Sequence, residues 1–314
     1  MNTRLDPVRA AGTPAQGAAT ARGRAGAAAV VAPRSPLAAT LRRVASLVVV
    51  HAVLLTGAAF VLLPFLWMLV TSIKPPDEIF TATLRLWPHH FNAVDNYRHA
   101  LTSAPLLRFA LNGLIVCAGI LCVQLLTAIP CAYALAKLRF PGRRALFVLT
   151  LLALAIPVQV PALPLYIAIA KVGFLNTYLS MMFPFFLSVF AIFLLRQFFK
   201  GFPDDIIHAA RLDGMGELEI VWRIVTPSAV PAIAAFAVFS FVAHWNDLYW
   251  PLIVISDANL APPPLGMMFF ADAETGSNYG ALTAAATILT APLVIAFLVA
   301  RRQFIAGITM TGVK

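Results

Sequence analysis

Residues 107–135, "LRFALNGLIVCAGILCVQLLTAIPCAYAL", form an apolar run in which Arg108 is the one charged side chain. A bilayer's hydrocarbon core is about 30 Å thick, and a helix needs about 20 apolar residues to cross it. Because lipid offers the backbone no hydrogen bonds, such a run must be a helix or a strand of a closed barrel. The apolar residues here are continuous rather than alternating, which favours a helix. The run therefore predicts a transmembrane helix.

The composition of the whole chain extends this prediction. The 314 residues are 61% hydrophobic and 11% charged, whereas a soluble domain carries roughly 25% charged residues. We therefore predict an all-α integral membrane protein whose transmembrane domain occupies residues 45–300. Six runs are long enough to be spans, at about residues 45–71, 107–135, 145–170, 177–199, 229–255 and 281–300.

The two ends of the chain differ from this apolar middle. Residues 1–44 are rich in Ala, Gly, Pro and Arg, so we predict a disordered basic tail. The first apolar run is longer than the roughly 7–15 residues of a signal peptide's apolar region, so we expect it to be a retained helix. Residues 301–314 are predicted to form a second tail. Four prolines predict kinks or breaks in the third and fifth runs: Pro157, Pro161, Pro164 and Pro251.

The distribution of basic residues predicts the orientation. With six spans, 18 of the 23 Lys and Arg residues fall on one side of the membrane. Loops rich in Lys and Arg stay in the cytoplasm, so we predict that both termini and the loop at residues 200–228 are cytoplasmic. The natural partner of this charge is anionic lipid, and we expect no nucleic acid.

The loop between spans four and five contains the charged stretch "PDDIIHAARLDGMGELEIVWRIVTP", residues 203–227. Asp204 and Asp205 suit the first turn of a helix, where they complement its dipole. Gly214 suits a left-handed turn at the helix end, and a second apolar helical pattern follows. We predict a cytoplasmic helix–turn–helix. A small-residue face for close contact with another surface is predicted at Ile206, Ala209, Ala210 and Asp213, although an ordinary solvated loop also fits the pattern.

This loop resembles the coupling loop of ABC importer permeases, in which "EAA" is followed by a glycine and then by I-x-x-P. In that family the helical pair docks in a groove on the ATP-hydrolysing subunit and transmits its closure to the membrane helices. The pattern departs at His208, where the family has a Glu that can pair with basic residues of the ATPase, so we expect this contact to differ. The resemblance implies coupling roles for His208, Ala209, Ala210, Asp213, Gly214, Met215, Ile224 and Pro227.

Further stretches of residues 65–314 are similar to the maltose-type carbohydrate permeases, in particular their shorter six-span type. The resemblance implies import of a sugar or related polyol across the cytoplasmic membrane of a prokaryote. It implies as partners a second, different permease, an ABC ATPase dimer and an extracytoplasmic solute-binding protein. The similar stretches are "WPHHFNAVDNY", "YALAKLRFPGRR", "IPVQVPALPLY", "LLRQFFKGFP", "HWNDLYWPLIV" and "RRQFIAGITMTGVK".

The chain lacks the G-x-x-x-x-G-K-[ST] loop that cradles nucleotide phosphates. We therefore expect no enzymatic activity and no cofactor in this chain, with ATP and magnesium on the partner ATPase. No metal site is expected either, because His89-His90 and Asp204-Asp205 lack a convincing third ligand.

Polar residues inside the membrane are expensive, so those on the fifth run are candidates for a substrate path. Trp245, Asn246 and Asp247 offer the aromatic face, amide and carboxylate that bind sugars. For Asn246 and Asp247, contacts that hold helices together near the interface are the simpler interpretation.

Two other classes of function stay open. One is a transporter driven by an ion gradient, which needs ionisable residues near the bilayer midplane; Asp247 is the one candidate and lies off-centre. The other is a membrane enzyme that uses Asp204, Asp205 and a metal. The identity of the sugar, and whether this chain touches it, are left open by the sequence.

Overall fold

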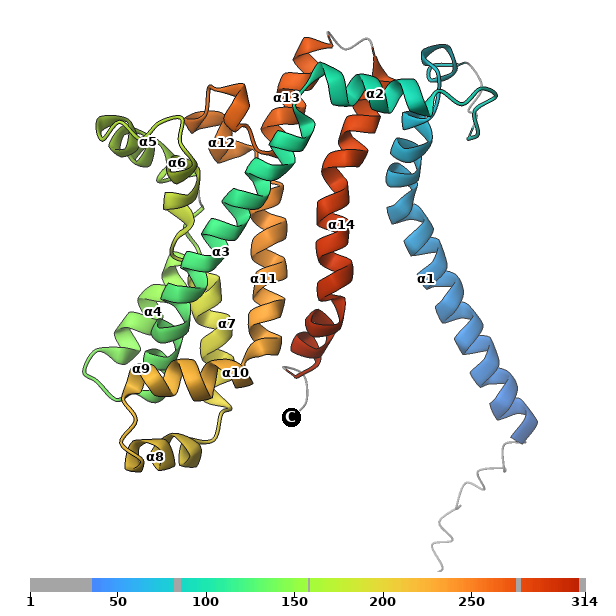
Figure 1. Cartoon of the computed structure of the whole chain (residues 1–314). Coiled ribbons are helices and arrows are strands. Elements are labelled where there is room, and N and C mark those ends of the chain that lie inside the picture. The colour runs from blue at the N-terminus through green and yellow to red at the C-terminus, as the bar shows by residue number, and fades with distance from the viewer. Residues whose placement is uncertain (1–35, 82–85, 158, 275–277, 311–314) are drawn as a thin grey trace, which may run out of the picture. The chain divides into compact units, whose positions relative to one another are not determined.

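The computed structural model describes residues 36–81, 86–157, 159–274 and 278–310. Within these ranges every regular element is a helix, as Figure 1 shows. The chain divides into two units, residues 1–60 and 61–314. The described part of the first unit is the beginning of α1 (Pro36–Ser72), which continues into the second unit.

The predicted tail at residues 1–44 is wrong for residues 36–44, which belong to α1; residues 1–35 lie outside the described residues. Proline suits the first position of a helix, where its missing N–H is not needed. The sequence that follows Pro36, "LAATLRRVAS", is rich in the strong helix formers Ala, Leu and Arg. Helix propensity therefore extends the apolar run towards the N-terminus.

The second unit holds the other helices of the described chain. Its short 3₁₀ segments are Pro76–Glu78, Phe183–Phe185 and Ala258–Leu260, and Val221–Val225 is a π-helical turn. Its α-helices are α2 (Ala93–Ser103), α3 (Leu106–Lys137), α4 (Arg143–Ala153), α5 (Ala162–Lys171), α6 (Tyr178–Met182), α7 (Val189–Lys200), α8 (Asp204–Leu212), α9 (Glu217–Ile220), α10 (Thr226–Ser228), α11 (Val230–Trp245), α12 (Tyr249–Val254), α13 (Pro263–Ala273) and α14 (Tyr279–Met310).

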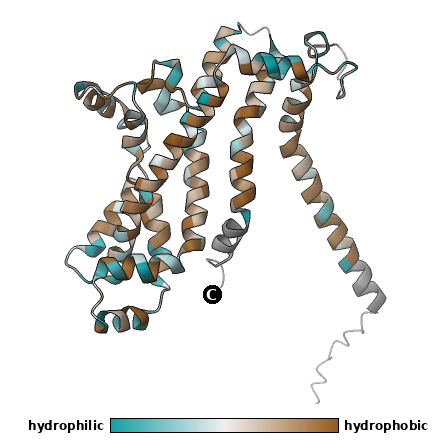
Figure 2. Cartoon of the chain, viewed as in Figure 1, coloured by the Kyte–Doolittle hydropathy of each residue, from teal (hydrophilic) through white to brown (hydrophobic). Residues whose placement is uncertain are grey.

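Three helices of the described chain are long and apolar enough to cross a membrane, and two bent pairs bring the number to five if each pair is one span. The bends are 47° between α6 and α7, and 82° between the α9–α10 segment and α11. Figure 2 shows apolar residues along most of α3, α11 and α14. An all-helical membrane fold is confirmed, whereas the six-span count and the orientation stay predictions.

The helix boundaries differ from the predicted ones at three places. The run at residues 145–170 is not one helix but two, α4 and α5, because Pro157 and Pro161 lack the N–H that a continuous helix needs. The predicted C-terminal tail is wrong for residues 301–310, which continue α14. The fifth run is also broken, since α11 ends at Trp245 and α12 begins at Tyr249.

α3 connects two clusters of buried apolar side chains. Near its N-terminal end, Phe109 and Ile120 pack in a first cluster with α13 and α14. Near its C-terminal end, Ile129 and Tyr133 pack in a second cluster with residues of α7, α8 and α9. α3 also packs directly on α7 and α11, and α11 packs on α14 (Figure 1). The helix–turn–helix therefore rests on the same long helix that runs into the opposite cluster.

Candidate functional site

The charged stretch folds as the predicted helix–turn–helix. Asp204 and Asp205 lie in the first turn of α8, where carboxylates complement the positive end of the helix dipole. A short connection leads to α9, a π-helical turn and α10 before α11 begins. Figure 1 shows α8 and the α9–α10 segment gathered near the C-terminal end of α3.

The turn between the two helices depends on glycine. Gly214 has φ of +83°, a conformation that side chains with a Cβ adopt only at a cost. Its N–H donates to the carbonyl of Arg211 at 3.1 Å, and the N–H of Met215 donates to the carbonyl of Ala210 at 3.0 Å. These bonds satisfy carbonyls at the end of α8. The predicted left-handed turn at Gly214 is confirmed.

The side of this unit that faces the rest of the chain is apolar. Ile207 and Ala210 are 2% and 4% exposed and belong to the second cluster. Met215 and Ile224 are partly buried against that cluster. The predicted small-residue face is therefore wrong at Ala210, because a helix that rests on its own protein must turn some residues inward. Ala210 holds the unit in place from inside, and Met215 and Ile224 contribute to this packing with part of their surface.

The opposite side carries exposed apolar side chains, of which the sequence analysis predicted only Ile206 for contact with another surface and missed the two leucines. Leu212 is 88% exposed, Leu218 is 68% exposed and Ile206 is 46% exposed. They lie on both sides of the Gly214 turn, and we call them the exposed rim. Exposed apolar patches rimmed by polar residues are typical of protein interaction sites, so the exposed rim is a candidate docking surface. His208, Ala209, Asp213 and Pro227, which the family pattern singles out, are exposed as well.

Polar contacts fasten the unit to α3. The Tyr133 hydroxyl donates to Oε2 of Glu217 at 2.7 Å, and Nε of Arg211 donates to the other carboxylate oxygen of Glu217 at 2.7 Å. Lys137 Nζ donates to Oδ1 of Asp204 and to the carbonyl of Phe202, both at 2.6 Å. Tyr133 and Lys137 of α3 thus join α3 directly to α9 and to the start of α8.

The Lys137–Asp204 pair also has an electrostatic consequence. The hydrogen bond and positive charge of Lys137 hold the pKa of Asp204 below its ordinary value. The Lys137 side chain is 6% exposed and that of Asp204 is 66% exposed, so solvent screens one partner. Asp204 is engaged by a lysine on α3 and is poorly placed to share a metal ion with Asp205.

The backbone between the helix–turn–helix and the membrane segment contains a π-helical turn, Val221–Val225. The hydroxyl of Thr226 donates to the carbonyl of Val221 at 2.7 Å, and Pro227 follows in α10. An 82° bend separates this segment from α11. Single π-turns occur often at functional sites. Thr226-Pro227, which the sequence predicted to lead into the next membrane helix, therefore lies just before a sharp bend between two packed helical segments.

A second candidate site is a cavity of about 600 Å³ bordered by residues of α3, α4, α5, α7, α11 and α12. Its wall contains the aromatic rings of Phe185, Phe190, Tyr249 and Trp250. Among the described lining residues there is one carboxylate, Asp247, and no Lys or Arg. The remaining polar groups of the wall are Gln124, Gln159, Ser188, His244 and Asn246.

Hydrogen bonds fix the polar wall of this cavity. The amide nitrogen of Gln124 donates to the carbonyl of Phe185 at 2.9 Å, and its oxygen accepts from the hydroxyl of Ser240 at 2.6 Å. The same nitrogen lies 3.4 Å from Nε2 of His244, whose ring packs on Phe185 at 4.6 Å between centroids. The wall is thus preorganised by contacts between segments far apart in the sequence.

The structure separates the three residues predicted for a substrate path. Asn246 and Asp247 line the cavity, but Trp245 does not. Trp245 is 2% exposed, and its indole nitrogen donates to the carbonyl of Leu289 on α14 at 3.2 Å. The ring that lines the cavity is Trp250, whose nitrogen donates to the carbonyl of Ser180 at 2.8 Å. The predicted role of Trp245 in a substrate path therefore finds no place at this cavity, because α11 turns the ring towards α14.

The histidine pair at residues 89 and 90 has a structural use. Both backbone N–H groups donate to the Glu78 carboxylate, at 2.9 Å and 3.3 Å. These bonds lower the pKa of Glu78. Among the described residues no three His, Cys, Asp or Glu side chains are grouped as metal ligands.

Comparison with known proteins decides the family. Residues 124–309 match the model of the binding-protein-dependent transport system inner membrane component. The chain belongs to this family. Its relatives are named as permease subunits of transport systems rather than as enzymes. The matched residues include both the helix–turn–helix and much of the cavity wall.

Curated relatives cover most of this permease. The diacetylchitobiose uptake system permease protein NgcG of Streptomyces coelicolor is 33% identical over 265 residues, which are 83% of this chain and 87% of that protein. The arabinooligosaccharides transport system permease protein AraQ of Halalkalibacterium halodurans is 32% identical over 264 residues, 82% and 94% of the two chains. The sn-glycerol-3-phosphate transport system permease protein UgpE of Yersinia pestis is 31% identical, with the same coverage.

A solved structure shares the fold of this permease. It is described as a bacterial ABC transporter involved in the import of the acidic polysaccharide alginate, and it covers 84% of this chain and 98% of its own. The TM-score is 0.73 and the sequence identity 22%. The arrangement of helices around the cavity and the helix–turn–helix is therefore a known permease fold.

Proposed function

We propose that this chain is one permease half of an ATP-driven importer for a sugar or related polyol. One observation carries the coupling part of the proposal. The exposed rim, Leu212, Leu218 and Ile206, surrounds a glycine turn whose inner side is fastened to α3. Such a unit offers an apolar surface to a partner and a rigid link to the membrane helices.

The partner proposed for this rim is an ABC ATPase dimer, which would bind ATP and magnesium. Family membership supports this assignment, since the family is the membrane component of binding-protein-dependent systems. A second permease would complete the membrane part, and an extracytoplasmic solute-binding protein would deliver the substrate. Closure of the ATPase would then move α8 and α9, and Tyr133 and Lys137 would pass the movement to α3.

The cavity supports an uncharged oligosaccharide as the substrate. Aromatic faces such as Trp250 and Tyr249 bind sugar rings, while Gln159, Asn246 and Asp247 offer hydrogen-bond partners for hydroxyls. The described lining contains no cation that would pair with a phosphate or a uronic acid. The relatives named for diacetylchitobiose and arabinooligosaccharides fit this wall better than those named for glycerol phosphate or alginate.

Affinity purification from native membranes, combined with uptake of labelled sugar, tests the proposal. Wild-type protein should bring down a second permease and an ATPase, and uptake should stop when ATP is depleted. Gly214→Val forces a β-branched residue into φ of +83°. This conformation costs roughly 1–2 kcal/mol or more of backbone strain. Because the strain disrupts the turn, uptake and ATPase recovery should both fall at least tenfold.

The matched control is Gly216→Val. Gly216 has φ of −74° and open space around its Cβ position, so this variant should keep uptake within about twofold of wild type. Equal behaviour of the two valine variants would contradict the coupling role of the turn. Uptake that survives ATP depletion but stops with an uncoupler would instead favour the ion-driven transporter.

A further inference from the structure

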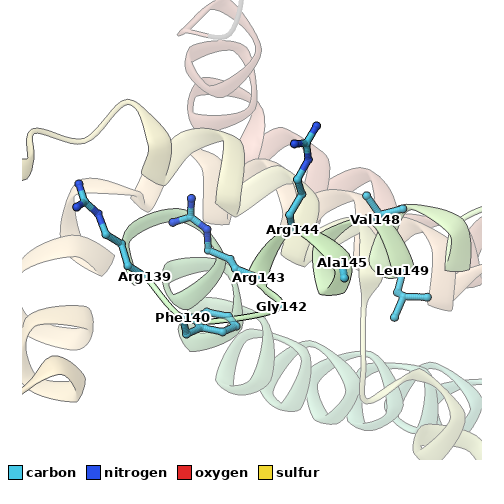
Figure 3. A pocket seen from close by; sticks show the side chains of 8 residues that line it. All are labelled: Arg139, Phe140, Gly142, Arg143, Arg144, Ala145, Val148 and Leu149. Carbon is cyan, nitrogen blue, oxygen red and sulfur yellow. The ribbon is translucent and has the colours of Figure 1, made fainter.

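Three arginines line an open hollow formed by the loop that follows α3 and by the first turns of α4. The hollow has a volume of about 920 Å³. Figure 3 shows the side chains of Arg139, Arg143 and Arg144 extending to the same side of the connecting loop, with Val148 and Leu149 farther along α4. The remaining lining residues are Phe140, Gly142 and Ala145.

These arginines have no acidic partner of their own in the described chain. The ion pairs of the described residues join Lys137 to Asp204, and Arg211, Arg223 and His99 to three glutamates. No carboxylate lines the hollow. Arg143 is held in place because its Nη1 donates to the carbonyl of Leu138 at 2.8 Å. Asp204 interacts with Arg139 through its charge from outside the lining, so the hollow concentrates positive charge that no carboxylate of its described lining neutralises.

The local backbone increases the need for an anion. α4 starts at Arg143 directly after Gly142, which has φ of +81°. Its first turn contains Arg143 and Arg144 and no acidic residue. Cations at the positive end of a helix dipole are unfavourable. An anion bound among these side chains would remove that repulsion.

The hollow continues onto an apolar surface. Val148 is 47% exposed and Leu149 is 59% exposed, and no side chain of α4 is fully buried within the chain. A ligand that fits both parts must carry a negative group and an extended apolar group. A small soluble anion such as inorganic phosphate has only the first of these.

We propose that the hollow binds an anionic phospholipid, with the phosphodiester among Arg139, Arg143 and Arg144 and an acyl chain along Val148 and Leu149. The planar guanidinium groups supply forked donors that match phosphate oxygens. Basic side chains beside apolar helices bind the headgroups of anionic lipids. The lipid would hold the start of α4 next to the α3 end that carries Lys137 and Tyr133.

Native mass spectrometry of the full chain, purified with its natural partners, tests the proposal. The protein is stripped of lipid and then titrated with dioleoyl phosphatidylglycerol, dioleoyl phosphatidylcholine or inorganic phosphate. Phosphatidylglycerol should bind at least tenfold more tightly than phosphatidylcholine. Arg139→Gln combined with Arg144→Gln should weaken phosphatidylglycerol binding about 30-fold, since each basic residue near an anionic lipid contributes roughly a factor of five. This double variant keeps the Arg143–Leu138 bond, so the loop should retain its fold.

The matched control is Arg98→Gln combined with Lys171→Gln, which removes the same charge from exposed sites on α2 and α5. It should bind phosphatidylglycerol like wild type. Equal binding of both lipids, or equal loss in the two double variants, would overturn the proposal. Inorganic phosphate that binds as tightly as the lipid would also overturn it. A double variant that loses a co-purifying protein while its lipid binding is unchanged would assign the hollow to that protein instead.

Discussion

The helix–turn–helix and the cavity are both built around α3, but their polar groups are arranged differently. The helix–turn–helix is fastened by charged side chains, such as the Lys137–Asp204 and Arg211–Glu217 pairs, and turns apolar side chains outward. The cavity is fastened by neutral groups, Gln124 and Ser240, and turns aromatic and amide groups inward.

This difference indicates two kinds of partner. An exposed apolar rim on a charged base fits a protein surface, which buries the rim on docking. A neutral, preorganised wall of aromatics and amides fits a small polar ligand that must enter and leave. Four substitutions separate these two roles, and each is expected to affect one region while sparing the other.

The largest effect is expected from Leu212→Glu. Leu212 is 88% exposed and contributes little to packing within the chain, so the protein should fold normally. A central apolar contact of an interface is worth about 2 kcal/mol or more. ATPase binding, measured by co-purification, should therefore fall at least about 30-fold. Val94→Glu, at a 79% exposed position on α2, is the control and should bind ATPase normally; similar loss in both variants would contradict docking at the rim.

The next effect is expected from Asp247→Asn in the cavity. Asp247 is the carboxylate of the described lining, and hydrogen bonds to charged groups contribute about 1.5–3 kcal/mol. The KM for an uncharged oligosaccharide should rise at least about tenfold, while ATPase co-purification stays the same. Asp257→Asn, directly before the 3₁₀ segment Ala258–Leu260 and outside the cavity lining, is the matched control. An unchanged KM in Asp247→Asn would place the substrate elsewhere.

A smaller effect is expected from Tyr133→Phe. The variant loses the 2.7 Å bond to Glu217, worth about 1 kcal/mol. Hydrogen exchange of residues 204–227 should accelerate about fivefold, because α9 is then less firmly held on α3. Tyr178→Phe loses a comparable bond to Asn112 and should leave this segment unchanged. Equal exchange in the two variants would show that Tyr133 is not part of the link.

The smallest effect is a pH dependence at Asp204. Its pKa is lowered in the folded protein by Lys137, so its contribution to stability is present above the ordinary carboxyl pKa. That contribution is lost as the pH falls through the lowered pKa. Between about pH 5 and pH 3 the melting temperature should fall less in Asp204→Asn than in Asp205→Asn. Asp205 lies next to Asp204 in the same turn of α8. Identical slopes would mean that the exposed pair is fully screened.

Local sequence patterns predicted much of this architecture. Long apolar runs predicted the membrane helices. Asp204 and Asp205 predicted the beginning of α8, and Gly214 predicted its end. These signals are readable in the sequence because dipole complementarity and a positive φ act within a few residues. The prolines of the third run predicted a kink or a break, but not which of the two, nor the residues at which α4 ends and α5 begins. Proline allows a kink or a full stop, and packing of the surrounding helices selects between them.

The direction of individual side chains could not be predicted in the same way. Trp245 and Trp250 are five positions apart, yet one contacts α14 and the other lines the cavity. The Gln124–Ser240 bond joins residues 116 positions apart. Leu212 and Leu218 have the same side chain as many membrane-facing leucines, and only the packing of α8 on the second cluster shows that they are exposed at the turn.

Photo-crosslinking from position 212 tests the central claim most directly. A benzophenone amino acid replaces Leu212 in the full chain, native membranes are illuminated, and the attached partner is identified by mass spectrometry. The account predicts an ATP-hydrolysing subunit as the main product, with a stronger signal when ATP is bound. Attachment to lipid alone, or to the solute-binding protein, would contradict both the docking surface and the predicted orientation of the loop.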